Sequence, residues 1–174
     1  GFRMRQSLEE VTPLFDEPAV VICNHQSHLD LMCILLYSPN IVFLTNDWVW
    51  NNFFYGFLIR HAEYYPVSQG LDVIMPKLKD LVDRGYSIAV FPEGTRSADC
   101  KIRRFHQGAF RIASELGLDV EPMCLYGAGR VLPKTGRWLR KGRIHIDAAA
   151  RRGAVVAHDG AADQGAWLEV ESAA

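Results

Sequence analysis

Residues 19–30 of this chain read AVVICNHQSHLD, an apolar run followed by a polar one. The apolar half, residues 19–23, has the length and the β-branched content of a buried strand. The polar half contains a histidine and an aspartate five positions apart, His25 and Asp30. Because catalytic residues concentrate where a rigid element passes into a loop, this pattern predicts the edge of an active site.

A second polar segment follows another apolar run further along the chain. Residues 87–90 read SIAV, and residues 91–97 read FPEGTRS. If both apolar runs are parallel strands of one sheet, the polar segments that follow them lie at the same edge of that sheet. We therefore expect the two segments to meet in one cleft.

Apolar runs alternate with helical patterns along most of the sequence, which is typical of parallel strands joined by crossover helices. The pattern predicts strands at residues 19–23, 41–44, 64–67, 87–91, 120–125 and 143–147, and helices at 29–37, 48–59, 72–84 and 108–116. We expect a single α/β domain, residues 19–147, with a mostly parallel mixed sheet flanked by helices. Residues 1–18 are then a lead-in, and residues 148–174 an alanine- and glycine-rich tail.

The predicted helix at residues 72–84 has recognisable boundaries. Asp72 is a suitable N-cap, Pro76 is tolerated in a first turn, and Gly85 suits the position after the last turn. Gly117 closes the next predicted helix in the same way. We expect the apolar side chains of the first helix to face the sheet: Val73, Met75, Leu78, Leu81 and Val82.

The composition narrows the class of protein. A length of 174 residues with 49% hydrophobic content supports one domain with its own core. The 19 basic residues nearly balance the 20 acidic ones, so no overall charge favours nucleic acid as a partner. No apolar run has the length of a membrane span or of a signal peptide. The cysteines form no CxxC pair, and Cys23, Cys33 and Cys124 lie in apolar runs, which favours a reducing, cytosolic compartment.

His25 and Asp30 can act as one catalytic unit. An imidazole is a general base near neutral pH, and a carboxylate on its second nitrogen fixes the tautomer. Five positions do not suit one continuous helix, so we expect His25 in a loop and Asp30 in the first helical turn. Two other interpretations are a polar turn that only caps the helix and a metal site that includes Cys23 and His28.

The segment Glu93-Gly94-Thr95-Arg96 can bind an anion. Its glycine permits a tight turn with exposed N–H groups, and its threonine adds a hydroxyl. The guanidinium of Arg96 suits a phosphate group, to which it can donate two parallel hydrogen bonds. A solvated loop with a surface arginine is the alternative.

Together, the NHx4D pattern that contains His25 and Asp30 and the FPEGTRS segment at residues 91–97 strongly resemble the motifs of the glycerolipid acyltransferase family. The best-known members of that family are the lysophosphatidic acid acyltransferases, and the resemblance covers residues 19–147. It implies the glycerolipid acyltransferase fold. It also implies transfer of a fatty acyl group from acyl-CoA or acyl carrier protein to the hydroxyl of a lysolipid, with 1-acyl-sn-glycerol-3-phosphate as the leading acceptor.

The same resemblance assigns roles to individual residues. His25 is the base that deprotonates the acceptor hydroxyl, and Asp30 orients it. Residues 93–96 position the acceptor, with Arg96 as the phosphate ligand. No metal or redox cofactor is implied, because the acyl thioester is a co-substrate. A lipid acceptor implies work at the cytoplasmic face of the cell membrane, either as a peripheral protein or as part of a longer anchored chain.

The chain departs from the family in one respect. Many members carry an arginine that assists phosphate binding in the strand before the amphipathic helix, but residues 61–67 read HAEYYPV. Lys101, Arg103 or Arg104 could supply a replacement cation. Otherwise the acceptor has a different headgroup, such as that of an amino-acid lipid. Two further alternatives are a non-catalytic lipid-binding domain of the same fold and a thioester hydrolase.

Two segments are rich in large apolar side chains. Residues 47–59 are unusually aromatic, which suits an acyl groove, the membrane interface or a buried helix. Trp138 and Leu139 lie among basic residues, namely Lys134, Arg137, Arg140, Lys141 and Arg143. This mixture suits an anionic membrane surface, and the alternative is a solvated hairpin with a buried tryptophan.

Overall fold

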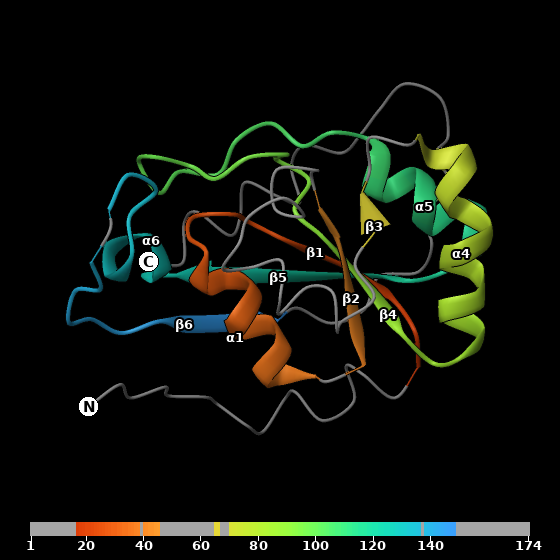
Figure 1. Ribbon diagram of the computed structural model, residues 1–174, viewed down its shortest axis with the longest axis horizontal. Coiled ribbons are helices and arrows are strands. Elements are labelled where there is room, and N and C mark those ends of the chain that lie inside the picture. Colours follow the sequence, from red (N-terminus) through yellow and green to blue (C-terminus); the bar gives the residue numbers. More distant parts are fainter. Residues whose placement is uncertain (1–16, 39, 46–64, 67–69, 137, 149–174) are drawn as a thin grey trace.

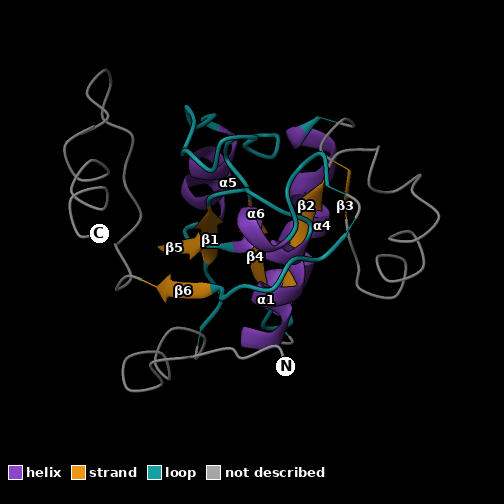
Figure 2. Cartoon of the chain, turned by 90° about the vertical axis from the view of Figure 1, so that its left-hand side faces the viewer, coloured by secondary structure: helices purple, strands orange, loops and turns teal. Residues whose placement is uncertain are grey.

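The computed structural model describes residues 17–38, 40–45, 65–66, 70–136 and 138–148. They form one mixed sheet with helices on both faces (Figures 1 and 2). The strands are β1 (Val20–Cys23), β2 (Ile41–Thr45), β3 (Tyr65–Pro66), β4 (Ser87–Val90), β5 (Val120–Tyr126) and β6 (His145–Ala148). The helices are α1 (Leu29–Tyr37), α4 (Leu71–Asp83), α5 (Gly108–Leu116) and α6 (Ala128–Val131). The prediction of an α/β domain with a mostly parallel mixed sheet is confirmed.

Strand β1 lies in the interior of the sheet, whose order is β3-β2-β4-β1-β5-β6. Its neighbours β4 and β5 both run parallel to it, and only β6 is antiparallel, against β5. All four residues of β1 are buried and apolar, which suits a parallel strand covered on both faces. The carboxyl end of β1, where the NHx4D segment begins, therefore lies between two other strands.

Alternate residues of β1 face opposite layers of the molecule. Val21 and Cys23 pack in a core with α1, and Val20 and Ile22 pack in a second core with α4 and α5. Figure 1 shows α4 and α5 together at one end, with α1 on the near face of the sheet. Because the sheet is enclosed from both sides, its polar chemistry is confined to the strand ends and the loops that follow them.

Helix α4 begins differently from the prediction. It starts after Gly70, and no side chain caps it. Asp72, predicted as the N-cap, is an exposed first-turn residue whose Oδ1 lies 2.9 Å from Nη2 of Arg111 on α5. The earlier start also places Pro76 inside the helix rather than in its first turn. Gly85 follows the helix with a φ of 88°, which agrees with its predicted place.

The buried face of α4 is formed by Ile74, Leu78 and Leu81. Their spacing of four and then three positions makes one stripe along the helix. Val73, predicted to face the sheet, lies off that stripe and is 56% exposed. The predicted face was therefore right for Leu78 and Leu81, and Met75 and Val82 also pack against the core as partly buried residues. It was wrong for Val73, and it omitted Ile74.

The ends of the other predicted strands and helices agree with the described structure to within one residue, with two exceptions. The last strand begins at His145 rather than at residue 143, and the short helix α6 was not predicted. The predicted helix at 48–59 and the tail beyond Ala148 lie outside the described residues. The four cysteines are free thiols; Cys23 and Cys33 are buried, and the other two are half-buried. None of the helices in the described ranges combines the length and the apolarity needed to cross a bilayer.

Candidate active site

The strand register brings the two polar segments together. In the parallel pair of β1 and β4, Val20 lies opposite Ile88. The same offset of 68 residues continues beyond the strand ends, where the backbone N–H of His25 donates to Oε1 of Glu93 over 2.8 Å. The two segments thus meet at one edge of the sheet, as parallel strands require.

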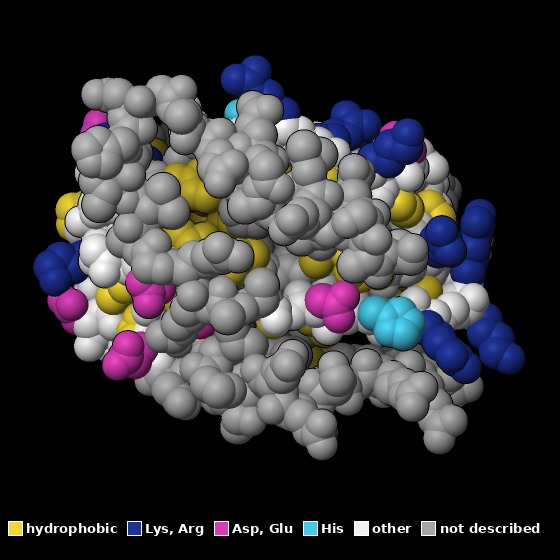
Figure 3. Space-filling view, turned by 180° about the vertical axis from the view of Figure 1, so that it is seen from behind, with side chains coloured by type: hydrophobic (Ala, Val, Ile, Leu, Met, Phe, Trp, Pro, Cys, Tyr) yellow, Lys and Arg dark blue, Asp and Glu magenta, His cyan; other side chains and the backbone are white. Residues whose placement is uncertain are grey.

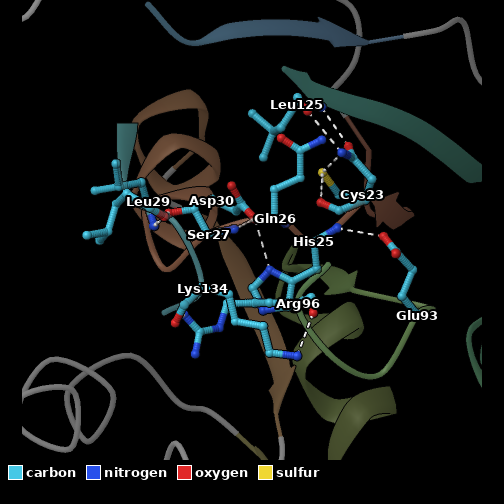
Figure 4. Close-up of polar contacts among 12 residues, drawn as sticks. Cys23, His25, Gln26, Ser27, Leu29, Asp30, Glu93, Arg96, Leu125 and Lys134 are labelled. Carbon is cyan, nitrogen blue, oxygen red and sulfur yellow. Dashed lines mark hydrogen bonds and ion pairs between the residues drawn. The ribbon is translucent and has the colours of Figure 1, made fainter. Parts of the chain in front are cut away.

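His25 and Asp30 form a hydrogen-bonded pair at the end of β1 (Figure 4). Nδ1 of His25 lies 2.9 Å from Oδ2 of Asp30, and Asp30 is the second residue of α1. The same oxygen accepts the backbone N–H groups of Gln26 and Ser27 over 2.7 and 2.8 Å. These three bonds fold the carboxylate back onto the ring, as the five-position spacing predicted. Because a carboxylate accepts hydrogen bonds, it holds the proton on Nδ1 and leaves Nε2 as the basic nitrogen.

Glu93 is a buried residue that holds the backbone of His25. Its Oε1 accepts the N–H of His25, its Oε2 accepts the N–H of Arg103 over 3.0 Å, and its side chain is 5% exposed. The carbonyl of His25 in turn accepts the N–H of Ser97 over 2.7 Å. Burial raises the pKa of Glu93, and the two N–H donors partly oppose that rise. Both peptide groups that flank the His25 ring are therefore fixed by the second segment.

Phe91 supports the imidazole of His25 from one side. The two rings are stacked, with centroids 4.1 Å apart and an interplanar angle of 19°. Phe91 also begins a β-turn, in which its carbonyl accepts the N–H of Gly94 over 3.0 Å, and Pro92 occupies the second position that such turns favour. Gly94 has a φ of 68°, a conformation that a β-carbon disfavours. After the turn, Gly94 and Thr95 are exposed, whereas Ser97 is buried again.

Asn24 locks the end of β1 to β5. Its Nδ2 donates to the carbonyl of Leu125 over 2.9 Å, and its Oδ1 accepts the N–H of the same residue over 2.7 Å. The side-chain amide thereby acts as a peptide group of an added strand residue, because asparagine carries both a donor and an acceptor. Sequence reasoning missed this role, although an asparagine between a strand and a candidate base is the signal for it.

Arg96 and Lys134 bring two cations to the same turn. Nζ of Lys134 donates to the carbonyl of Arg96 over 2.8 Å and to Oγ1 of Thr95 over 3.3 Å, and Nη1 of Arg96 donates to the carbonyl of Lys134 over 3.4 Å. Figure 4 shows both side chains on the side of the site where the His25 ring lies. The sequence did not predict Lys134 at this turn, because Lys134 and Arg96 are 38 positions apart and belong to no common motif.

His28 adds no positive charge to this group at neutral pH. Burial lowers its pKa to about 4, with further lowering by the charges of Arg96 and His25 and an opposing effect of Asp30. The positive charge beside the dyad therefore comes from Arg96 and Lys134.

Comparison with known proteins identifies the family. Residues 3–126 match the family described as Acyltransferase, and these residues contain both motifs of the site. The chain belongs to the glycerolipid acyltransferase family. A 1-acyl-sn-glycerol-3-phosphate acyltransferase of Chlamydomonas reinhardtii is 32% identical over 145 residues, which are 79% of this chain and 43% of that protein.

The fold of this chain is also that of a solved relative. The crystal structure of the 1-acyl-sn-glycerophosphate (LPA) acyltransferase PlsC from Thermotoga maritima matches with a TM-score of 0.70 and 26% identity, over 90% of this chain and 63% of that one. A more distant relative, a lyso-ornithine lipid O-acyltransferase of Pseudomonas aeruginosa, is 26% identical over 75% of this chain and 57% of that protein. The chain spans less than half the length of the Chlamydomonas relative.

The other basic candidates for a headgroup contact lie on the loop that follows the second motif. The side chains of Lys101, Arg103 and Arg104 are all exposed. The structure ties this loop to the site through backbone groups, namely the N–H of Arg103 on Glu93 and the N–H of Lys101 on Asp99 over 3.4 Å. A headgroup contact by these side chains stays a prediction.

The alternative metal site at Cys23, His25, His28 and Asp30 does not fit the geometry. Oδ2 of Asp30 already accepts three N–H groups. Burial, with the nearby charge of Asp30, raises the pKa of the Cys23 thiol, and its Sγ donates to the carbonyl of Asn24 over 3.4 Å. Within the described residues, no three possible ligands converge on one point.

Proposed function

We propose that this chain transfers a fatty acyl group from an acyl thioester to the free hydroxyl of 1-acyl-sn-glycerol-3-phosphate. The observation that carries the proposal is a histidine held by a buried carboxylate next to two cations. Asp30 is 0% exposed and fixes the His25 ring, while Arg96 and Lys134 meet at the adjoining turn. A base suits a hydroxyl acceptor, and paired cations suit the phosphate on the same molecule. The relatives named for this acceptor add support.

The reaction follows from the tautomer of His25. Nε2 takes the proton of the acceptor hydroxyl as its oxygen attacks the thioester carbonyl carbon, a form of catalysis worth about 10² to 10⁴ in rate. Asp30 stabilises the imidazolium that forms. When the tetrahedral intermediate collapses, the C–S bond breaks and the leaving sulfur takes the proton from Nε2. The products are a diacylated lipid and a free thiol, and the histidine returns to its starting state.

Lys134 can supply the cation that many family members provide with an arginine in the stretch equivalent to residues 61–67. Its ammonium lies at the Thr95-Arg96 turn, where the phosphate of the acceptor is expected. We assign Lys134 as the second cation of the phosphate site, in preference to Lys101, Arg103 or Arg104. The donor is an acyl thioester of coenzyme A or acyl carrier protein, and we place the reaction at the cytoplasmic membrane face, where those donors and a lysolipid meet.

Measurement of free thiol release tests the activity. The chain is mixed with an acyl thioester and, in turn, lysophosphatidate, lyso-ornithine lipid, other lysolipids or no acceptor. We expect release that depends on lysophosphatidate and is lost in His25→Ala, with a circular dichroism spectrum that matches the parent. Release without acceptor would identify a thioester hydrolase, and lipid binding without release would identify a binding domain. Release with lyso-ornithine lipid alone would replace the proposed acceptor.

Two charge variants test the phosphate site. Arg96→Ala and Lys134→Met should each raise the KM for lysophosphatidate about tenfold or more, because a hydrogen bond to a charged group contributes about 1.5–3 kcal/mol. The KM for the thioester should change little. Lys101→Met is the matched control. A larger effect at Lys101 than at Lys134 would overturn the assignment.

A further inference from the structure

The loop between α6 and β6 combines exposed apolar and basic side chains. Residues 132–143 read LPKTGRWLRKGR, which includes five basic residues and no acidic one. Trp138 is 84% exposed and Leu139 is 64% exposed. The alternative of a solvated hairpin with a buried tryptophan is therefore wrong for the tryptophan. Arg140, Lys141 and Arg143 are exposed beside them.

Backbone hydrogen bonds fix this loop at two points in its described residues, 132–136 and 138–143. The carbonyl of Pro133 accepts the N–H of Gly136 over 2.9 Å, and the carbonyl of Val131 accepts the N–H of Arg140 over 2.7 Å. Val131 and Ile144, which flank the loop, are 1% and 3% exposed. Trp138 and Leu139 are thus presented to solvent between two buried anchors.

We propose that residues 132–143, the docking loop, bind the surface of an anionic lipid bilayer. Tryptophan has an apolar ring and a polar N–H, so it suits the boundary between lipid headgroups and acyl chains. Exposed Leu139 adds apolar area, and the neighbouring cations attract anionic headgroups. Figure 3 shows Lys and Arg side chains gathered at its right-hand edge, the end of the molecule that carries α6 and β6.

The docking loop is connected to the acceptor site. Lys134, near the start of the loop, donates to the carbonyl of Arg96 at the turn proposed to bind phosphate. Docking would therefore place the active-site edge beside the leaflet that supplies the lysolipid. This inference rests on the proposed transfer to a membrane lipid, but it makes a separate claim, about the surface and not about the chemistry.

Vesicle co-sedimentation of the full chain tests the docking loop. The vesicles contain phosphatidylcholine alone or phosphatidylcholine with phosphatidylglycerol. We expect binding to the anionic vesicles, weakened about tenfold or more in Trp138→Ser. Arg140→Ala with Lys141→Ala should weaken it about 25-fold, since each cation near an anionic leaflet strengthens binding by about fivefold. Higher salt should weaken binding of the parent.

Matched controls lie on α4, at the opposite end of the molecule (Figure 1). Val73→Ser removes another exposed apolar side chain, and Lys77→Ala with Lys79→Ala removes the same charge. Loss of binding in these controls equal to that in the loop variants would overturn the proposal, and so would unchanged binding in the loop variants.

Activity measurements separate docking from chemistry. In detergent micelles, the loop variants should transfer acyl groups to lysophosphatidate at the parental rate. An inactive parent chain with intact, loop-dependent vesicle binding would refute the proposed function and leave the docking loop standing. If the loop variants bind vesicles normally but lose binding to acidic acyl carrier protein, the loop docks that protein instead, and the membrane proposal fails.

Discussion

Glu93→Gln separates a positioning role from a substrate-binding role. Each Glu93 oxygen accepts one backbone N–H, from His25 over 2.8 Å and from Arg103 over 3.0 Å. Glutamine keeps one acceptor and turns its NH₂ group toward the other N–H, so one hydrogen bond is lost. Loss of such a charge-assisted bond lowers the free energy of unfolding by about 1.5–3 kcal/mol, and the N–H left without a partner lowers it further.

Part of the stability lost in Glu93→Gln is regained because the substitution removes a buried charge. Burial raises the pKa of Glu93, so the charged form is disfavoured where it stands, and a neutral side chain avoids that penalty. We expect the free energy of unfolding to fall by about 1–3 kcal/mol. Because a displacement of about 1 Å at a catalytic group costs on the order of 100-fold, kcat should fall between about tenfold and 100-fold.

Denaturant unfolding and steady-state kinetics measure the two effects of Glu93→Gln. The KM for the acceptor should stay within about twofold of the parent, because both Glu93 oxygens bond the chain itself. Glu115→Gln is the control; this glutamate of α5 is exposed and paired with Arg111, and an exposed pair contributes about 0–1 kcal/mol. A raised acceptor KM with unchanged kcat and stability would refute the positioning role.

Three other changes test the supports of the dyad. Asp30→Asn should lower kcat by about 100-fold or more with little change in acceptor KM, because the carboxylate fixes the His25 tautomer; unchanged kcat would count against the dyad. Asn24→Ala leaves the N–H and carbonyl of Leu125 without their side-chain partner, so the free energy of unfolding should fall by about 2–4 kcal/mol in denaturant titrations; a loss below about 0.5 kcal/mol would contradict this. The pKa of His28 is lowered from 6.5 to about 4, so the folded state resists its protonation and loses stability as the pH falls from 6.5 through 4. Screening at this half-buried side chain limits the loss to about 1–2 kcal/mol, and His28→Asn should remove that part of the pH dependence.

The sequence predicted the elements of the sheet better than the faces of its helices. Apolar runs identify buried strands because both faces of a parallel sheet are covered. On α4, however, Val73 and Ile74 are adjacent and both apolar, and only packing in the core shared with β1 and β4 selects Ile74. The predicted N-cap of α4 was wrong for a similar reason: the exposed Asp72 carboxylate pairs with Arg111, on a helix that is close in space but distant in sequence.

In the candidate site, too, contacts between residues close in sequence could be predicted, and contacts between distant residues could not. The pairing of His25 with Asp30 is local, so spacing and strand-to-helix geometry were enough to predict it. The position of Lys134 depends on how the chain after α6 returns to the second motif, which no periodicity encodes. Its ammonium contacts Thr95 and the carbonyl of Arg96, so a cation search limited to residues near the motif favours Lys101, Arg103 and Arg104, whose exposed side chains lie on the following loop. A missing motif residue in this fold is therefore best sought among loops that close on the same strand ends, whatever their distance in sequence.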